Sequence, residues 1–212
     1  MYSVKEIYFT IQGEGRNTGQ AAVFLRFTGC NLWSGLEADR AKAVCQFCDT
    51  DFVGTGGPGG GVFSSADELA QSVHRIWQMD ESNGAQPFVV GTGGEPLIQM
   101  DQEVVDALRS LGFTVAIETN GTLPAPSGID WLCVSPKAGT DLAISEGTEL
   151  KLVFPQEGVE PAHYERLNFK HFYLQPMDGS QKEENTRMAI EYCKAHPTWR
   201  LSLQTHKILG LP

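Results

Sequence analysis

Short runs of apolar, β-branched and aromatic residues recur along the chain and predict β-strands. The runs cover residues 21–27, 88–91, 113–118, 131–134, 150–154, 171–175 and 200–204. Most of them are continuously apolar rather than alternating, which is typical of parallel strands that are buried on both faces. The pattern therefore predicts a sheet made mainly of parallel strands.

Segments with apolar residues at helical spacing alternate with these strands, and they cover residues 65–79, 101–112 and 182–196. The first segment places Glu68 three residues after Ser65, which is a capping-box signature. The second ends on Gly112, a residue type that often ends helices. This alternation of strands and helices indicates an α/β barrel or a doubly wound sheet.

One connection is poor in helix-forming residues. Residues 119–130 are rich in Pro and Gly, which disfavours a packed helix, and the segment after residue 134 is little better. We therefore expect an α/β fold that is a thinned, incomplete (β/α)6-type barrel, with parallel strands and some outer helices missing. A single domain is expected over residues 1–212, and the Gly-rich run at 54–61 is expected to be a mobile surface loop.

Composition and charge narrow the function classes. The chain has 212 residues and a net charge of −10, and this acidic balance argues against a general nucleic-acid binder. No apolar run approaches the roughly 18 residues of a membrane span, and the first residues lack a signal-peptide pattern. The odd cysteine count of five fits a reducing cytoplasm, and it indicates metal or redox chemistry rather than disulfides.

Unusual polar motifs stand directly after five of the predicted strands. They read TGC…CQFCDT (28–50), TGGEP (92–96), ETNG (118–121), SPK (135–137) and QPMD (175–178). In parallel α/β folds, ligands bind at the carboxyl ends of the strands. Five motifs at the same rim therefore predict a ligand site there.

Three cysteines in the first motif, Cys30, Cys45 and Cys48, indicate a metal centre. Thiolates hold iron–sulfur clusters, and three of them on a four-iron cluster leave one iron open for another ligand. A zinc site completed by His163 or His206 is the alternative, as are three unrelated thiols. The upstream cysteine without a partner pair favours the cluster.

The order of these motifs resembles a known group of enzymes. The aromatic Phe47 before the last cysteine, and GGEP at 93–96, resemble the radical S-adenosylmethionine superfamily. The segments that narrow the match are TIQGEGRNTGQAAVFLRFTGCN (10–31), CDT (48–50), TGGEP, ETNG, SPK, QPMD and the terminal QTHKILGLP. Together they resemble the 7-carboxy-7-deazaguanine synthases from end to end.

One feature departs from the superfamily pattern. Most members place three residues between the first two cysteines, whereas here residues 31–44 intervene. A longer loop adds little closure entropy, so we retain all three cysteines as ligands. The domain is therefore expected to carry an enlarged cluster-binding loop (30–48), with a C-terminal substrate-pocket segment (204–212).

The resemblance implies an activity and its cofactors. It implies a carbon–nitrogen lyase that converts 6-carboxy-5,6,7,8-tetrahydropterin to 7-carboxy-7-deazaguanine with loss of ammonia, in 7-deazapurine (queuosine-type) biosynthesis. The implied cofactors are a [4Fe–4S] cluster, S-adenosylmethionine and Mg²⁺. No side chain is expected to be catalytic, because the cluster and S-adenosylmethionine would generate the radical. A cytoplasmic homodimer supplied by an electron donor such as flavodoxin is also implied.

The resemblance also implies a set of site residues. The cluster ligands are Cys30, Cys45 and Cys48, and the Mg²⁺ ligand is Thr50. The cofactor-binding set is Phe47, Cys48, Asp49, Gly94, Glu118, Ser135, Pro136, Lys137, Gln175, Pro176, Met177 and Asp178. The substrate-binding set is Ile11, Gln12, Gly13, Glu14, Arg26, Thr92 and Pro212.

Several of these assignments carry specific expectations. Arg26 suits the substrate carboxylate, because guanidinium binds carboxylate through two parallel hydrogen bonds; the alternative is a structural ion pair with Glu14 or Asp49. The apolar C-terminus is expected to be docked, with the terminal carboxylate of Pro212 on the pterin's amine edge. An extension past Pro212 is then expected to cripple turnover. Gln204 and His206 could line the same pocket, and a structural role suits each of them at least as well.

Two other functions stay open from the sequence. One is an activase that installs a glycyl radical on a partner protein, which would need a docking surface rather than a pterin pocket. The other is a non-enzymatic, zinc-stabilised α/β binding module. Iron, sulfide and zinc content would separate the second from the enzyme.

Overall fold

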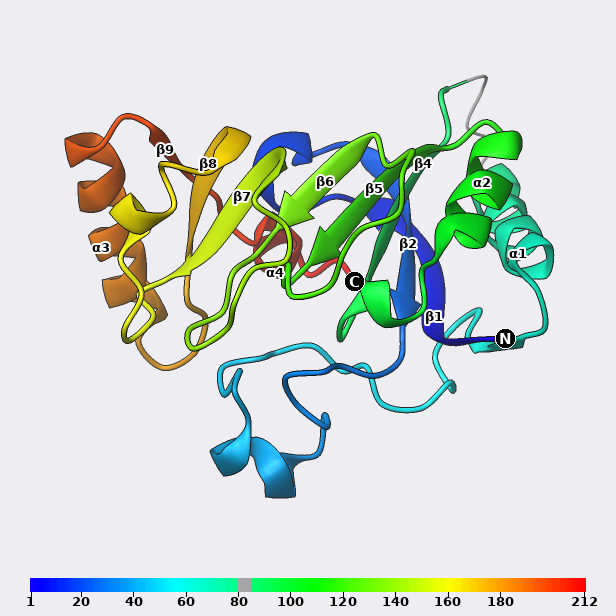
Figure 1. Cartoon of the computed structure of the whole chain (residues 1–212), viewed down its shortest axis with the longest axis horizontal. Coiled ribbons are helices and arrows are strands. Elements are labelled where there is room, and N and C mark those ends of the chain that lie inside the picture. Colours follow the sequence, from blue (N-terminus) through cyan, green and yellow to red (C-terminus); the bar gives the residue numbers. More distant parts are fainter. Residues whose placement is uncertain (80–84) are drawn as a thin grey trace.

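The computed structural model describes residues 1–79 and 85–212. In this part of the chain, one open sheet has the strand order β3-β1-β2-β4-β5-β6-β7-β8-β9 (Figure 1). All neighbours from β2 to β9 are parallel, whereas β1 and β3 add antiparallel strands at one edge. The sheet does not close on itself among these residues, so the prediction of an incomplete barrel is confirmed.

The predicted strands are all present. They are β2 (Ala21–Phe27), β4 (Phe88–Gly93), β5 (Thr114–Thr119), β6 (Trp131–Val134), β7 (Glu146–Phe154), β8 (Asn168–Pro176) and β9 (Trp199–Leu201). β9 is shorter than predicted, because Ser202 leaves the strand and bonds to Gln175 and Gly15.

Two strands were not predicted, β1 (Tyr2–Ile11) and β3 (Gly61–Phe63). The register of β1 against β2 shifts between Val4 and Glu6. A bulge of this kind interrupts the period of two on which a strand is recognised in a sequence.

The three predicted helices are α1 (Ala66–Met79), α2 (Gln102–Ser110) and α3 (Lys182–Ala195). The Ser65 hydroxyl accepts the Glu68 N–H as predicted, although the Glu68 carboxylate turns to Ser64. Shorter helices are α4 (Thr205–Leu209) and the 3₁₀ turns η1 (Gly15–Asn17), η2 (Glu37–Lys42), η3 (Pro96–Ile98) and η4 (Pro161–His163). No helix of the described residues is both long and apolar enough to cross a membrane.

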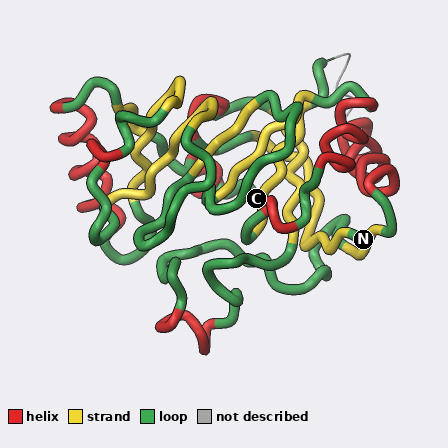
Figure 2. The backbone as a smooth tube through the Cα atoms, in the orientation of Figure 1, coloured by secondary structure: helices red, strands yellow, loops and turns green. Residues whose placement is uncertain are grey.

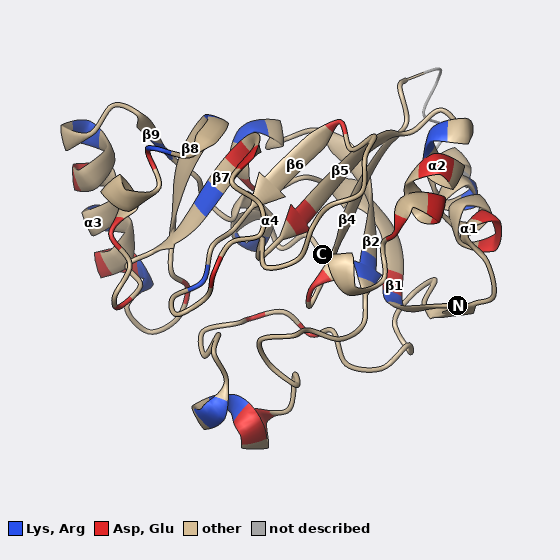
Figure 3. Ribbon diagram, viewed as in Figure 1, with Lys and Arg blue, Asp and Glu red and all other residues tan. Residues whose placement is uncertain are grey.

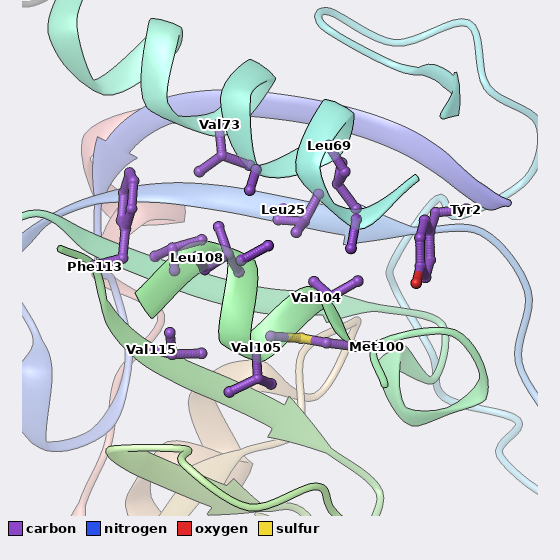
Figure 4. Packing of buried hydrophobic residues seen from close by; sticks show 14 of the residues in the cluster. Tyr2, Leu25, Leu69, Val73, Met100, Val104, Val105, Leu108, Phe113 and Val115 are labelled. Carbon is purple, nitrogen blue, oxygen red and sulfur yellow. The ribbon is translucent and has the colours of Figure 1, made fainter. Parts of the chain in front are cut away.

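The hydrophobic core lies between the helices and one face of the sheet. Leu69 and Val73 of α1 and Val104 and Leu108 of α2 pack beside Leu25 of β2 (Figure 4). A second cluster lies where α3 covers β8 and β9. No helix fills the segments between β5 and β6 or between β6 and β7, as the Pro- and Gly-rich composition predicted.

Residues 54–60 form a surface loop, as predicted, but its backbone packs against β1. Pro58 accepts the Ile7 N–H at 2.8 Å, and the Gly57 N–H donates to Lys5 at 3.0 Å. A Cβ at Gly60 would lie 2.2 Å from the Lys5 carbonyl oxygen. The glycines therefore let the backbone of this segment pack directly on β1.

Candidate active site

The strands turn alternate side chains to opposite faces of the sheet. Arg26, Thr92, Glu118, Lys151 and Gln175 come from five different strands, and all line one cavity of about 390 Å³. The apolar residues next to four of them in the sequence lie in the core: Leu25, Phe27, Ile117, Leu150, Leu152 and Leu174. The helices thus cover one face of the sheet, and the other face is left for a ligand.

A buried carboxylate joins three of the rim motifs. Glu95 has no exposed surface, and it accepts hydrogen bonds from the Thr119 hydroxyl and the Asn120 N–H, each at 2.7 Å. Its own N–H donates to the Gly29 carbonyl at 2.9 Å. Burial raises the pKa of Glu95, while these hydrogen bonds act to lower it. Glu95 is fully engaged in holding TGC, TGGEP and ETNG together.

The two glycines before Glu95 allow the backbones of β4 and β2 to approach closely. Gly93 has a φ of +144°, and a Cβ there would lie 2.3 Å from the Phe27 carbonyl oxygen. A Cβ at Gly94 would lie 2.2 Å from the Gly29 carbonyl oxygen and 2.7 Å from the Cys30 Cβ. Any side chain at Gly94 would displace the loop that presents Cys30.

The three predicted cluster cysteines, Cys30, Cys45 and Cys48, line the same cavity. Hydrogen bonds, first from Cys45 and also from Thr50, lower the pKa of Cys48 to about 6, whereas burial raises the pKa of Cys30. Thiolates are the metal-binding form.

The donor set fits a cluster better than a single ion. No three His, Cys, Asp or Glu side chains of residues 1–79 and 85–212 lie close enough to share one metal ion. A multi-iron cluster does not need them to meet at one point, because each thiolate binds a different iron. Three thiols in the wall of one cavity are therefore a donor set that suits a [4Fe–4S] cluster.

A buried lysine joins two predicted ligand-binding carboxylates. The Lys151 side chain is 4% exposed, and its ammonium donates to Glu14 at 2.5 Å and to Glu118 at 2.9 Å. Figure 3 shows charged residues on β5 and β7, within the sheet. Burial acts to lower the pKa of Lys151, but the charges of Glu118 and Glu14 raise it well above the usual value. For Glu14, burial alone would raise the pKa of the carboxyl group, but Lys151 lowers that pKa to about 2.

Lys151 was not among the predicted site residues. The sequence signal was a lysine inside the apolar run LKLVF, where a cation needs a partner. The run was interpreted as a strand buried on both faces. In the structure its side chains alternate, and Glu149 and Lys151 face away from Leu150 and Leu152.

A second buried carboxylate holds the segment after β1. Glu149 accepts the Arg16 N–H at 3.0 Å, and Ser202 accepts the Gly15 N–H at 2.9 Å. A Cβ at Gly15 would lie 2.0 Å from the Glu149 Oε1 atom. Burial raises the pKa of Glu149. These contacts fix the backbone that carries Gln12 to Glu14, and the Gln12 amide donates to Glu118 at 2.9 Å.

Arg26 makes an ion pair, but not with the partners considered from the sequence. Its Nε donates to Glu6 at 2.7 Å, and its Nη2 donates to the Tyr8 hydroxyl at 2.9 Å. The structural ion pair that was the alternative is therefore present, but its partner is Glu6 rather than Glu14 or Asp49. The reason is that β1 pairs directly with β2 and places Glu6 opposite Arg26.

The C-terminal segment reaches the cavity through polar contacts. The Thr205 N–H donates to the Gly13 carbonyl at 2.9 Å, and Gln204 donates to Glu14 at 3.1 Å. Lys207 bridges Asp49 and Asp178, and its hydrogen bond lowers the pKa of Asp178 to about 2.

The C-terminal segment docks as expected, but not through its apolar residues. Ile208 and Leu209 are 65% and 62% exposed, so the contacts of α4 come from its polar residues instead. Pro212 is exposed as a whole but still contributes to the cavity wall.

Nearly the whole predicted set lines this one cavity. The members in its wall are Ile11, Gln12, Gly13, Glu14, Arg26, Cys30, Cys45, Phe47, Cys48, Asp49, Thr50, Thr92, Gly94, Glu118, Ser135, Lys137, Gln175, Pro176, Met177, Asp178 and Pro212, together with Gln204 and His206. Pro136 is not in the wall; it is buried, and its carbonyl accepts from Gln156 at 3.3 Å. The wall also contains Tyr8, Lys151 and Lys207, which were not among the predicted site residues, although Lys207 lies in the predicted substrate-pocket segment.

Comparison with known proteins identifies similar chains over the full length. A 7-carboxy-7-deazaguanine synthase of Burkholderia multivorans is 57% identical over 211 residues, covering 100% of this chain and 99% of the relative. One from Bacteroides thetaiotaomicron is 38% identical, with the same coverage. A crystal structure of QueE from Escherichia coli matches with a TM-score of 0.70 and 29% identity, covering 95% of this chain and 93% of that chain. No family model matches the chain.

Proposed function

The chain belongs to the 7-carboxy-7-deazaguanine synthase family, and on that premise we propose that it converts 6-carboxy-5,6,7,8-tetrahydropterin to 7-carboxy-7-deazaguanine with loss of ammonia. This makes it a carbon–nitrogen lyase of 7-deazapurine biosynthesis. The observation that carries the proposal is one cavity lined by three cysteines and by a buried lysine between two carboxylates.

At the cluster end, Cys30, Cys45 and Cys48 would hold a [4Fe–4S] cluster. When bound, the cluster and S-adenosylmethionine supply the one-electron chemistry that a side chain cannot. The cofactor-binding set named from the sequence would hold S-adenosylmethionine, with Gly94 offering bare backbone. Trp33, Phe47 and Phe52 line the cavity near these cysteines and would exclude water from the reacting groups.

At the other end, Ile11 to Glu14, Arg26, Thr92 and Pro212 would bind the substrate. Glu6 and Tyr8 use two of the five N–H donors of Arg26, so donors are left for a substrate carboxylate. Because the pKa of Glu14 is about 2, its carboxylate is ionised at neutral pH. Glu14 would therefore accept hydrogen bonds from the pterin's amino groups rather than donate a proton.

Thr50 would be the protein ligand of a Mg²⁺ ion. One hydroxyl is a weak site by itself, and Mg²⁺ keeps several water or substrate oxygens in its shell. Substrate oxygens would complete the site, so we expect Mg²⁺ to lower the substrate KM. We further propose that the enzyme works in the cytoplasm as a homodimer and takes electrons from a donor such as flavodoxin.

The test is anaerobic incubation of the reconstituted protein with S-adenosylmethionine, a reductant, Mg²⁺ and 6-carboxytetrahydropterin. We expect the deazaguanine product without any protein partner. A partner requirement, with no pterin turnover, would favour the glycyl-radical activase instead. Stoichiometric zinc without iron would favour the binding module. The effect of an extension past Pro212 stays a prediction for the same assay.

Replacing Cys48 with alanine is expected to abolish turnover and to lower bound iron and sulfide sharply, because a thiolate ligand is lost. Cys193→Ala is the matched control, since Cys193 lies on α3 and outside the cavity wall. Iron and sulfide analysis of both variants checks the assignment. Full cluster content in the Cys48 variant would contradict it.

A further inference from the structure

The insertion between the first two cysteines, residues 31–44, has defined structure and packing contacts of its own. Residues 37–42 form η2, which projects from the sheet below the strand ends (Figures 1 and 2). Trp33 is buried and meets the buried Phe52 edge-on at 5.6 Å between ring centroids. The Val44 N–H donates to the Leu32 carbonyl at 3.0 Å, which closes the insertion at its base.

Arg40 of η2 connects this insertion to the Cys45–Cys48 loop. Its Nη1 donates to the Gln46 carbonyl at 2.8 Å and to the Cys48 carbonyl at 3.0 Å. The guanidinium carbon lies 4.1 Å from the centroid of the Trp33 ring, and Nε pairs with Glu37 at 2.8 Å. Trp33 and Glu37 thus fix the position of the guanidinium, and the guanidinium binds the backbone carbonyls of Gln46 and Cys48.

These contacts constrain the loop that two predicted cluster ligands share. Two carbonyls bound to one planar group cannot rotate independently, so the directions of the Cys45 and Cys48 side chains are limited. The guanidinium also places a positive charge beside the Cys48 backbone. Nearby charge and hydrogen bonding set the reduction potential of an iron–sulfur cluster.

We propose that Arg40 is a positioning residue for the cluster, which holds the Cys45–Cys48 loop in its binding geometry and raises the cluster's reduction potential. The proposal rests on the proposed function, because it assumes that these cysteines bind a [4Fe–4S] cluster. Through Arg40, the insertion thereby holds the backbone of the Cys45–Cys48 loop in place. Arginine suits this role because its rigid fork bonds several acceptors while it stacks on an aromatic ring.

The test compares Arg40→Gln with Lys42→Gln in the anaerobically reconstituted enzyme. Both changes remove one positive charge from η2, but Lys42 is exposed at its end, and none of the described residues bonds to its side chain. We expect Arg40→Gln to lose iron to a chelator at least about tenfold faster than wild type, since two charge-assisted hydrogen bonds are lost. We also expect a more negative midpoint potential, because the reduced cluster carries the greater negative charge. Lys42→Gln is expected to match wild type in chelator resistance.

Arg40→Lys separates geometry from charge. It keeps the charge but not the planar fork, so we expect fast iron loss with a midpoint potential near that of wild type. Hydrogen exchange of the metal-free proteins gives a second measure, and residues 45–50 are expected to exchange faster in Arg40→Gln than in Lys42→Gln. Identical behaviour of the two glutamine variants would overturn the proposal. Absence of a cluster from wild type would instead overturn the proposed function.

Discussion

Replacing Lys151 with methionine is expected to destabilise the fold by about 3–5 kcal/mol at neutral pH, because one partner of a buried ion network is removed. The carboxylates of Glu14 and Glu118 would then lie close together without the cation that both now bind. Both carboxylates belong to the proposed ligand sites, so turnover is expected to fall with stability.

The stability difference is expected to depend on pH. Lys151 lowers the pKa of Glu14 from 4.5 to about 2, so this carboxylate stabilises wild type above about pH 4.5, and the contribution is lost as the pH falls towards 2. Without the lysine, burial raises that pKa, and ionisation opposes folding. The deficit of Lys151→Met should therefore be largest at neutral pH and shrink on acidification.

Thermal unfolding followed by circular dichroism between pH 7 and pH 4 measures this difference. Lys170→Met is the matched control, because Lys170 lies on the neighbouring strand β8 but is exposed to solvent. We expect the control to unfold within about 0.5 kcal/mol of wild type. Equal stability of the two variants at pH 7 would show that the network contributes little.

Replacing Gly94 with alanine is expected to remove the cluster and to destabilise the fold by about 1–3 kcal/mol or more. The new Cβ would lie 2.2 Å from a backbone oxygen of Gly29, and a backbone oxygen cannot swing away as a flexible side chain can. Relief requires the loop before Cys30 to move away from the end of β4. Iron and sulfide content and the unfolding temperature would both fall.

Gly56→Ala is the control for this substitution. A Cβ there meets nothing within 4 Å among the described residues, and no positive φ is involved. We expect unchanged cluster content and near-wild-type stability. An iron-loaded, stable Gly94→Ala protein would show that the contact between the two loops is not needed to present Cys30.

The rim of the site was predictable because its residues are close in sequence to strand ends. TGGEP and ETNG follow β4 and β5, and parallel neighbours bring such ends together. Lys151 was not predicted as a site residue because its partners, Glu14 and Glu118, are distant in the chain, 137 and 33 residues away. Local pattern indicates that a buried cation needs a partner but does not name which one.

The partner of Arg26 and the docking of the C-terminus show the same limit. The choice of Glu6 depends on the register of β1, and that strand was hidden by its bulge. Apolar composition suggested that the C-terminus docks, yet Thr205 and Lys207 make the contacts and Ile208 stays exposed. For these residues the decisive information is three-dimensional pairing rather than residue type.

The antiparallel direction of β1 has a consequence for how new specificities can arise. The segment after β1 returns along the sheet and meets the segment after β9 in the wall of the cavity. Two short segments, 11–16 and 202–212, are thus bonded to each other, so a change in one requires a matching change in the other. An engineered change of this part of the cavity wall therefore has to exchange both segments together, and not either one alone.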